Sequence, residues 1–283
     1  MKNTTAILSA SLLIASYSQA QNEIDALRYS QLTFSGTTRF TSMGGAFGAL
    51  GADASALSFN PAGIALFRKG EFTISPGMIT AKTNSTYNGT QGVDNRSNVY
   101  MNNCALIMAF VRDPEEKPGW RGTMLGIAYN RTNNFNNRTA ISGKNSSSSL
   151  LDVFTSNAAG IDTADLEPFS TQLAYNAGLI TPSAPGVYNS ALNSYGNKQE
   201  KGVDSRGYMS ETVITLGGNY SDKLFLGATF AFPHLRYNEI ASYKEIVEND
   251  SLNTLKSFTY DQNLSTKGTG FNFKFGMIYK PVD

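Results

Sequence analysis

The sequence predicts an all-β protein, an antiparallel transmembrane β-barrel whose lumen is plugged by an N-terminal segment. Three observations lead to this fold class. The chain of 283 residues starts with an export signal. Six later segments alternate apolar and polar side chains with a period of two, and some carry aromatic residues at their ends. Short connections alternate with long ones, as they do in bacterial transmembrane barrels.

These patterns divide the chain into three parts. We predict a signal peptide at 1–20, an N-terminal hatch at 21–70 and a partial barrel at 71–283 with a long extracellular loop at about 143–206. In the signal, Lys2 is the positive start, a short apolar run follows, and Ser18-Gln19-Ala20 places small residues at the cleavage positions. The apolar run is too short to span a bilayer as a helix. We therefore expect export of the mature chain.

Composition argues against several classes of function. Without the signal and its Lys2, the chain has 22 basic and 22 acidic residues, so no net charge draws it to nucleic acid. Cys104 is the single cysteine and His234 the single histidine, which leaves neither an internal disulfide nor a multi-histidine metal site. No CxxC, HExxH, P-loop or GxSxG motif occurs. We expect no enzymatic activity, no metal and no cofactor.

Residues 39–68, RFTSMGGAFGALGADASALSFNPAGIALFR, are rich in small residues and nearly uncharged. Asn60 can cap a short helix, and Pro61 loses nothing at the first helical position because its missing donor would be free there anyway. Gly44 and Gly45 allow tight turns. A buried plug would use these features, although a Gly-rich loop and helix of a soluble domain would also fit them.

The strand predictions follow from the alternation. In residues 271–280, Phe271, Phe273 and Phe275 share one face, which fits lipid, and Lys274 lies on the other, which fits a wet lumen. Five earlier stripes repeat the pattern: Phe72-Ile74-Met78, Tyr100-Cys104-Leu106-Met108-Phe110, Leu125-Ile127-Tyr129, Tyr208-Ser210-Thr212-Ile214-Leu216-Gly218-Tyr220 and Leu224-Leu226-Ala228-Phe230-Phe232.

The connections differ greatly in length. Residues 113–119 and 221–223 are short turns, whereas about 60 residues separate the third strand from the fourth. That long segment has helix-compatible spacing at 149–157 and 169–179 and is unusually apolar for a loop. We expect its apolar side chains to capture an apolar ligand at the extracellular mouth: Leu150, Leu151, Phe154, Phe169 and Leu173. Residues 130–138, NRTNNFNNR, are either a ligand clamp or the polar extension of a strand, and the second interpretation is favoured.

Residues 39–68 resemble the N-terminal hatch of the FadL/TodX family of outer-membrane transporters. The resemblance is carried by Gly44-Gly45-Ala46, by Asp53-Ala54-Ser55-Ala56-Leu57 and by Asn60-Pro61-Ala62-Gly63, which occur in the family's order and spacing. It continues more loosely through the strands. The resemblance implies that Gly44, Gly45, Asn60, Pro61 and Ala62 belong to a hatch that gates the lumen.

The resemblance also implies a location, partners and a function. The location is the outer membrane of a Gram-negative bacterium. The partners are hydrophobic small molecules such as long-chain fatty acids, outer-membrane lipid, and the barrel assembly machinery during biogenesis. The function is passive diffusion of the hydrophobic molecules through a plugged barrel. Family barrels have fourteen strands and six cannot close, so we expect an N-terminal portion or an incomplete gene product. There are two alternatives: a structural or adhesive barrel without transport, and a secreted all-β enzyme.

Overall fold

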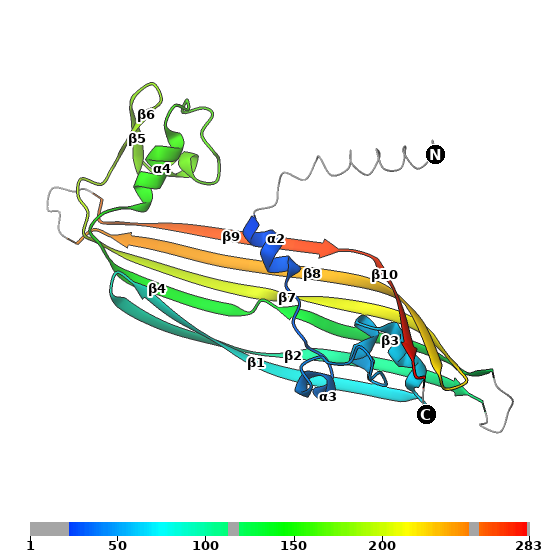
Figure 1. Ribbon diagram of the computed structural model, residues 1–283. Helices are drawn as coiled ribbons and strands as arrows, with labels where there is room; N and C mark the ends of the chain where they lie inside the picture. The colour runs from blue at the N-terminus through cyan, green and yellow to red at the C-terminus, as the bar shows by residue number, and fades with distance from the viewer. Residues whose placement is uncertain (1–22, 113–118, 249–254, 282–283) are drawn as a thin grey trace, which may run out of the picture.

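The computed structural model describes residues 23–112, 119–248 and 255–281 (Figure 1). The predicted signal peptide and most of the 113–119 turn lie outside these residues. The helices are α2 (Glu23–Ser30), α3 (Thr38–Ser42), η1 (Ala54–Ser58), η2 (Pro61–Leu66), α4 (Leu150–Ala158) and α5 (Thr171–Asn176). The strands are β1 (Glu71–Tyr87), β2 (Thr90–Val111), β3 (Trp120–Asn134), β4 (Asn137–Asn145), β5 (Ile180–Ala184), β6 (Val187–Ser190), β7 (Asn197–Tyr220), β8 (Leu224–Ile246), β9 (Ser257–Thr269) and β10 (Asn272–Tyr279).

One long antiparallel sheet dominates the described residues, in the order β1-β2-β3-β7-β8-β10. All six predicted strands lie on this path. The sheet extends beyond the predicted segments, because β1, β2, β7 and β8 are each longer than predicted. In addition, β4 continues β3 along β7, and β9 precedes β10 along β8. The breaks fall at Phe135-Asn136 and at Gly270-Phe271. Within the described residues, β1 lies at one edge and β9 and β10 at the other, so these strands form an open sheet.

The short turns join neighbouring strands directly. Tyr220 pairs with Leu224, so β7 and β8 are connected only by residues 221–223, as predicted. At the far end of the sheet, Asn88 and Gly89 close the β1–β2 hairpin with φ of 45° and 82°. Positive φ at both central residues is the geometry of a tight hairpin turn.

The long connection differs from the sequence-based prediction in its bounds. Residues 143–145 and 197–206, expected to be loop, extend β4 and β7, because they continue the cross-strand ladder between these strands. Helix α4 matches the predicted segment 149–157 except that it begins and ends one residue later, and α5 lies inside the predicted segment 169–179. The β5–β6 hairpin was not predicted. We call residues 146–196 the lid, and Figure 1 shows it as a separate lobe at one end of the sheet.

The two faces of the sheet differ. One face, which we call the inner face, packs against η1 and η2 around a core that includes Leu57, Ile64, Met124 and Phe225. The outer face carries exposed large apolar side chains over the part of the sheet near the 221–223 turn. We call this set the apolar band: Phe72, Ile74, Leu106, Met108, Phe110, Ile127, Ile214, Leu216, Phe230, Phe232, Phe271, Phe273, Phe275, Met277 and Tyr279.

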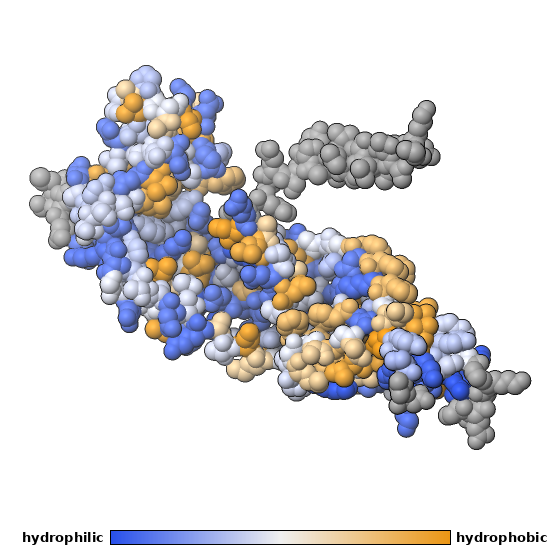
Figure 2. Space-filling view, viewed as in Figure 1, coloured by the Kyte–Doolittle hydropathy of each residue, from blue (hydrophilic) through white to orange (hydrophobic). Residues whose placement is uncertain are grey.

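Polarity also changes along the sheet. Figure 2 shows hydrophobic side chains gathered mainly at the end that carries η1, η2 and β10, and mostly hydrophilic ones at the far end. On the outer face of β8, for example, Phe230 and Phe232 are followed by His234, Arg236 and Asn238. Among the described residues, no helix is long and apolar enough to cross a bilayer.

Candidate binding surface on the inner face

Asn60 caps the short helix η2 as the sequence predicts. Its side-chain Oδ1 accepts a hydrogen bond from the backbone N–H of Ala62 at 3.1 Å, and Pro61 is the first residue of the helix. The Asn60 amide also donates to the carbonyl oxygen of Gly48 at 2.6 Å. This one side chain therefore fixes both the start of η2 and the preceding turn. Gly44 and Gly45 lie in an earlier turn at 43–45, where their φ of 62° and 79° favour glycine.

A row of glycines in three strands lets η2 lie directly on the sheet. Gly217 pairs with Gly227, which pairs with Gly276. A Cβ at Gly227 would lie 2.2 Å from the Pro61 carbonyl oxygen, and one at Gly276 would lie 2.0 Å from Asn60 Oδ1. Pro61 and Ala62 are buried here. The Asn60-Pro61-Ala62 segment thus packs directly on the backbone of the sheet, and no side chain larger than that of glycine fits between the segment and the sheet.

The end of η1 is hydrogen-bonded to the sheet. Thr229 Oγ1 donates to the carbonyl oxygen of Leu57 at 3.3 Å, and Lys274 Nζ donates to that of Ser58 at 2.8 Å. Asn130 Nδ2 donates to Ser58 Oγ at 2.7 Å. Carbonyls in the last turn of a helix lack partners within it, so these contacts satisfy groups that burial would otherwise leave unpaired.

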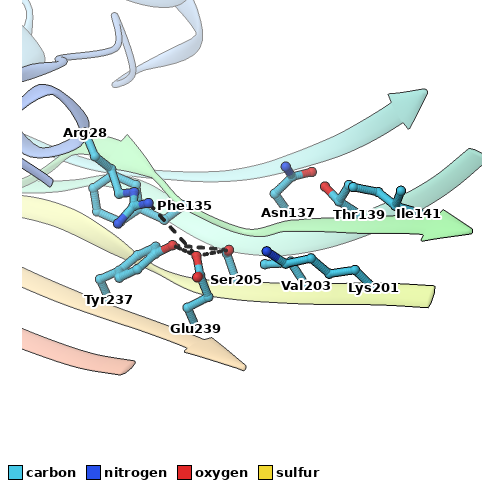
Figure 3. A pocket seen from close by; sticks show the side chains of 10 residues that line it. All are labelled: Arg28, Phe135, Asn137, Thr139, Ile141, Lys201, Val203, Ser205, Tyr237 and Glu239. Atoms are coloured by element: carbon cyan, nitrogen blue, oxygen red, sulfur yellow. Dashed lines mark hydrogen bonds and ion pairs between the residues drawn. The ribbon is translucent and has the colours of Figure 1, made fainter. Parts of the chain in front are cut away.

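Farther along the inner face, α2 covers a cavity of about 390 Å³. Figure 3 shows its two ends: Arg28, Phe135, Ser205, Tyr237 and Glu239 cluster at one, and Asn137, Thr139, Ile141, Lys201 and Val203 extend along β4 and β7 toward the other. The guanidinium of Arg28 lies 4.3 Å from the centre of the Tyr237 ring and 4.0 Å from Glu239 Oε2. Phe135 and Asn137 belong to the NRTNNFNNR segment, so part of that polar extension lines the cavity.

Tyr237 belongs to a polar cluster at one end of this cavity. Tyr237 Oη donates to Glu239 Oε2, and Ser205 Oγ lies 3.3 Å from both groups. Burial and the hydrogen bond to Glu239 raise the pKa of Tyr237 to about 12. Its hydroxyl is therefore a donor at neutral pH, and the cluster offers a ligand a cation, a carboxylate and an aromatic wall.

Two smaller hollows continue the cavity toward the lid. One, of about 250 Å³, is lined by residues that include Leu150, Phe154 and Tyr243, and the other, of about 150 Å³, lies between them along β7. Lys201 lines all three hollows. Within the described residues its ammonium forms no ion pair. The inner face therefore carries a line of adjoining hollows with one exposed cation at their junction.

The five predicted capture residues do not lie together. Leu150 and Phe154 line the hollow beneath the lid, and Phe154 packs edge-on against Tyr260 at 5.4 Å. Leu151 is fully buried in the core of the lid. Phe169 and Leu173 are exposed on its surface, Phe169 by 79%. Only Leu150 and Phe154 are thus placed to contact a molecule in the described hollows.

Glu245 on β8 joins the lid to the sheet by hydrogen bonds, and the sequence did not predict this role. Its carboxylate is fully buried and accepts hydrogen bonds from Ser149 Oγ (2.8 Å), Asn197 Nδ2 (3.0 Å) and Tyr243 Oη (2.8 Å). Ser149 in turn caps α4. Alternation could place Glu245 on the inner face, but nothing in the sequence pairs it with a serine 96 residues away. The Gly217, Gly227 and Gly276 row was missed as well, although each glycine stands in a predicted strand.

No group of histidine, cysteine, aspartate or glutamate among the described residues could hold a metal ion. No family profile, curated protein or solved structure matches the chain. The function is therefore argued from geometry.

Proposed function

We propose that this protein is an outer-membrane β-barrel that admits hydrophobic small molecules, such as long-chain fatty acids, by passive diffusion past an N-terminal hatch. The observation that carries the proposal is the contrast between the two faces of the sheet. The outer face exposes a broad apolar band, whereas the inner face is packed and hollowed. Soluble monomers rarely expose contiguous apolar surface on this scale.

The length of the apolar band supports a membrane location. On β8 the outer-face side chains are apolar from Leu224 to Phe232, which is close to the roughly 9–11 residues with which a tilted strand crosses a bilayer. Trp120, Tyr220 and Tyr279 lie at the end near the short turns. Aromatic side chains at this level match the girdles of membrane barrels. The edges of the sheet at β1 and β10 would pair with further strands, because an unpaired edge is unfavourable in lipid.

The inner face supports a role in passage. The hollows lead from the lid to the cavity under α2, and η1 and η2 lie on the same face beyond it. Apolar walls at roughly 25 cal/mol per Å² of buried surface can hold an acyl chain without any catalytic group. Lys201, which forms no ion pair among the described residues, would pair with the carboxylate of such a ligand. Displacement of η2 from the glycine row would open the route.

Two measurements test this function on the full-length protein. It should fractionate with outer membranes and migrate differently on gels with and without heating. Cells that express it should take up radiolabelled long-chain fatty acid faster than cells without it, while uptake of a small polar solute stays unchanged. Recovery as a soluble periplasmic protein would contradict the membrane location. An outer-membrane protein with no effect on uptake would instead be structural or adhesive.

A further inference from the structure

A groove of about 560 Å³ crosses the outer face of the sheet near the short-turn end. It is separate from the inner-face hollows, because it opens on the opposite side of β7 and β8. Its floor is made of small residues, including Gly218 and Ala228, and its walls include Trp120, Leu226 and Phe275. In the cross-strand register Ala228 stands between Leu216 and Phe275, so a small side chain separates two large ones.

The indole of Trp120 forms one fixed wall of this groove. It lies over Gly218, where a Cβ would be 2.7 Å from the indole Cζ3. It also packs edge-on against Tyr220, with ring centres 5.6 Å apart. Trp120 is still 54% exposed. An interfacial tryptophan of this kind marks the boundary between the apolar core of a membrane and its headgroups.

Arg112 gives the groove a charge. It lines the groove as the residue that follows β2, and its backbone N–H donates to the carbonyl oxygen of Arg121 at 2.8 Å. The described residues provide no ion pair to its guanidinium. At the same end of the sheet, by contrast, Arg68 pairs with Asp222 at 2.8 Å. A guanidinium that has no ion pair among the described residues, beside an apolar groove, is complementary to an anion that carries an apolar chain.

We propose that this groove binds one anionic phospholipid of the surrounding membrane. One acyl chain lies on the Gly218 and Ala228 floor, and the phosphate accepts hydrogen bonds from Arg112. The inference rests on the proposed function, because it requires the outer face to lie in a bilayer. A lipid fits this groove better than a peptide does. The N–H and C=O groups of a peptide in lipid need hydrogen-bond partners, and the groove walls, which are mainly side-chain carbon, offer none.

Trp120 provides the readout, since it is the only tryptophan in the 283 residues. The full-length protein is reconstituted in phosphatidylcholine vesicles with a rising fraction of lipid whose acyl chains are brominated, because bromine quenches indole fluorescence on contact. The brominated lipid is either phosphatidylglycerol or phosphatidylcholine. The Trp120→Phe variant supplies the background signal. Half-maximal quenching should need about five-fold less phosphatidylglycerol than phosphatidylcholine, the preference that one basic residue gives at an anionic lipid.

Two variants with matched controls locate the site. Arg112→Gln should abolish the preference, whereas Lys223→Gln, which removes a charge at the same end but outside the groove, should keep it. Ala228→Phe should fill the groove and weaken quenching by both lipids, whereas Thr212→Phe, also on the outer face, should not. Arg112 is exposed, so Arg112→Gln should fold and remains decisive if Ala228→Phe does not.

The negative outcomes are distinguishable. Equal quenching by both lipids, unaffected by Arg112→Gln, would overturn the specific site but leave the membrane location intact. Absence of quenching by either lipid would overturn both this inference and the proposed function, because the outer face would then lie outside the bilayer.

Discussion

Lys274 Nζ lies 2.7 Å from both carboxylate oxygens of Glu211. The same ammonium donates to the carbonyl oxygen of Ser58 at the end of η1. Asn272 Nδ2 also donates to Glu211, at 2.9 Å. One cation thus joins β10, β7 and the N-terminal segment. A single buried pair therefore contributes both to the sheet and to the attachment of η1.

Replacement of Lys274 by methionine should destabilise this region strongly. Glu211 is nearly fully buried, with a side-chain exposure of 7%, so loss of the cation leaves its charge uncompensated. Removing one partner of a buried pair costs roughly 3 kcal/mol or more. Urea unfolding of the reconstituted protein, followed by tyrosine and tryptophan fluorescence, measures the loss.

The double variant Lys274→Met/Glu211→Gln is the control for this pair. It removes both charges and should recover part of the stability, because replacing a whole buried pair is less costly than breaking it. If Lys274→Met alone left the stability unchanged, the contact between Lys274 and Glu211 would not hold η1 to the sheet.

Sequence alone predicted the strands well because the period of two is a local signal. The side on which Phe273 and Lys274 lie follows from alternation, and the structure places them on the outer and inner faces as expected. The cap at Asn60 was also predictable, because a cap needs only residues that are neighbours in the chain. These features depend on short-range physical chemistry.

The rest depends on contacts between distant segments. Alternation put Lys274 on the inner face but could not supply its partner Glu211, 63 residues earlier. Composition identified the lid as apolar but could not separate Leu151, which is buried within it, from Phe169, which is exposed. Such assignments require the register of the strands and the packing of the lid, and neither follows from one local pattern.

Gly227→Ala should displace η2 from the sheet. Its new Cβ would lie 2.2 Å from the carbonyl oxygen of Pro61, a backbone atom that cannot rotate away. Overpacking of this kind costs about 1–3 kcal/mol. Gly202→Ala on β7 is the matched control, because no atom lies within 4 Å of its Cβ position. Thermal unfolding should separate the two variants, and equal stability would contradict the close contact between η2 and the glycine row.

Asn60→Ala should loosen the start of η2. Loss of the hydrogen bond to the Ala62 N–H costs about 0.5–2 kcal/mol, so the amides of η2 should exchange faster with deuterated solvent. Asn60→Asp keeps the acceptor and should retain more protection. If η2 gates passage, Asn60→Ala should also slow apolar uptake or admit a small polar solute. Unchanged uptake together with faster exchange would limit the motif to packing.

Leu150→Gln should weaken ligand capture, and because Leu150 also packs against the core of the lid, unfolding of the variant is measured alongside. The side chain is half-buried and lines the hollow beneath α4. Loss of one apolar contact of this size lowers affinity about three- to ten-fold. Phe169→Gln is the control, because the Phe169 side chain is exposed on the lid surface and does not line the hollow. Titration with a fluorescent fatty acid measures both, and equal affinities would exclude this hollow from the binding route.

Phe273→Arg tests which face of the sheet meets lipid. Phe273 belongs to the apolar band, is 55% exposed and packs on Phe230 with ring centres 5.2 Å apart. If this position lies near the middle of a bilayer, arginine there should cost about 2–4 kcal/mol of folding free energy in vesicles. The cost arises because the guanidinium would leave water for hydrocarbon.

The control for Phe273→Arg must pair with the same strand, β8, and lie on the same face, but outside the apolar band. Asn263 on β9 meets these conditions, since it pairs with Ile240 of β8 and is exposed. Asn263→Arg should therefore change the stability by less than about 0.5 kcal/mol, as surface substitutions usually do. Both variants are unfolded from vesicles in urea and compared with the unmodified protein. Similar costs at the two positions would mean that the apolar band does not lie in a membrane, because water at Phe273 would solvate the arginine as well as it does at Asn263.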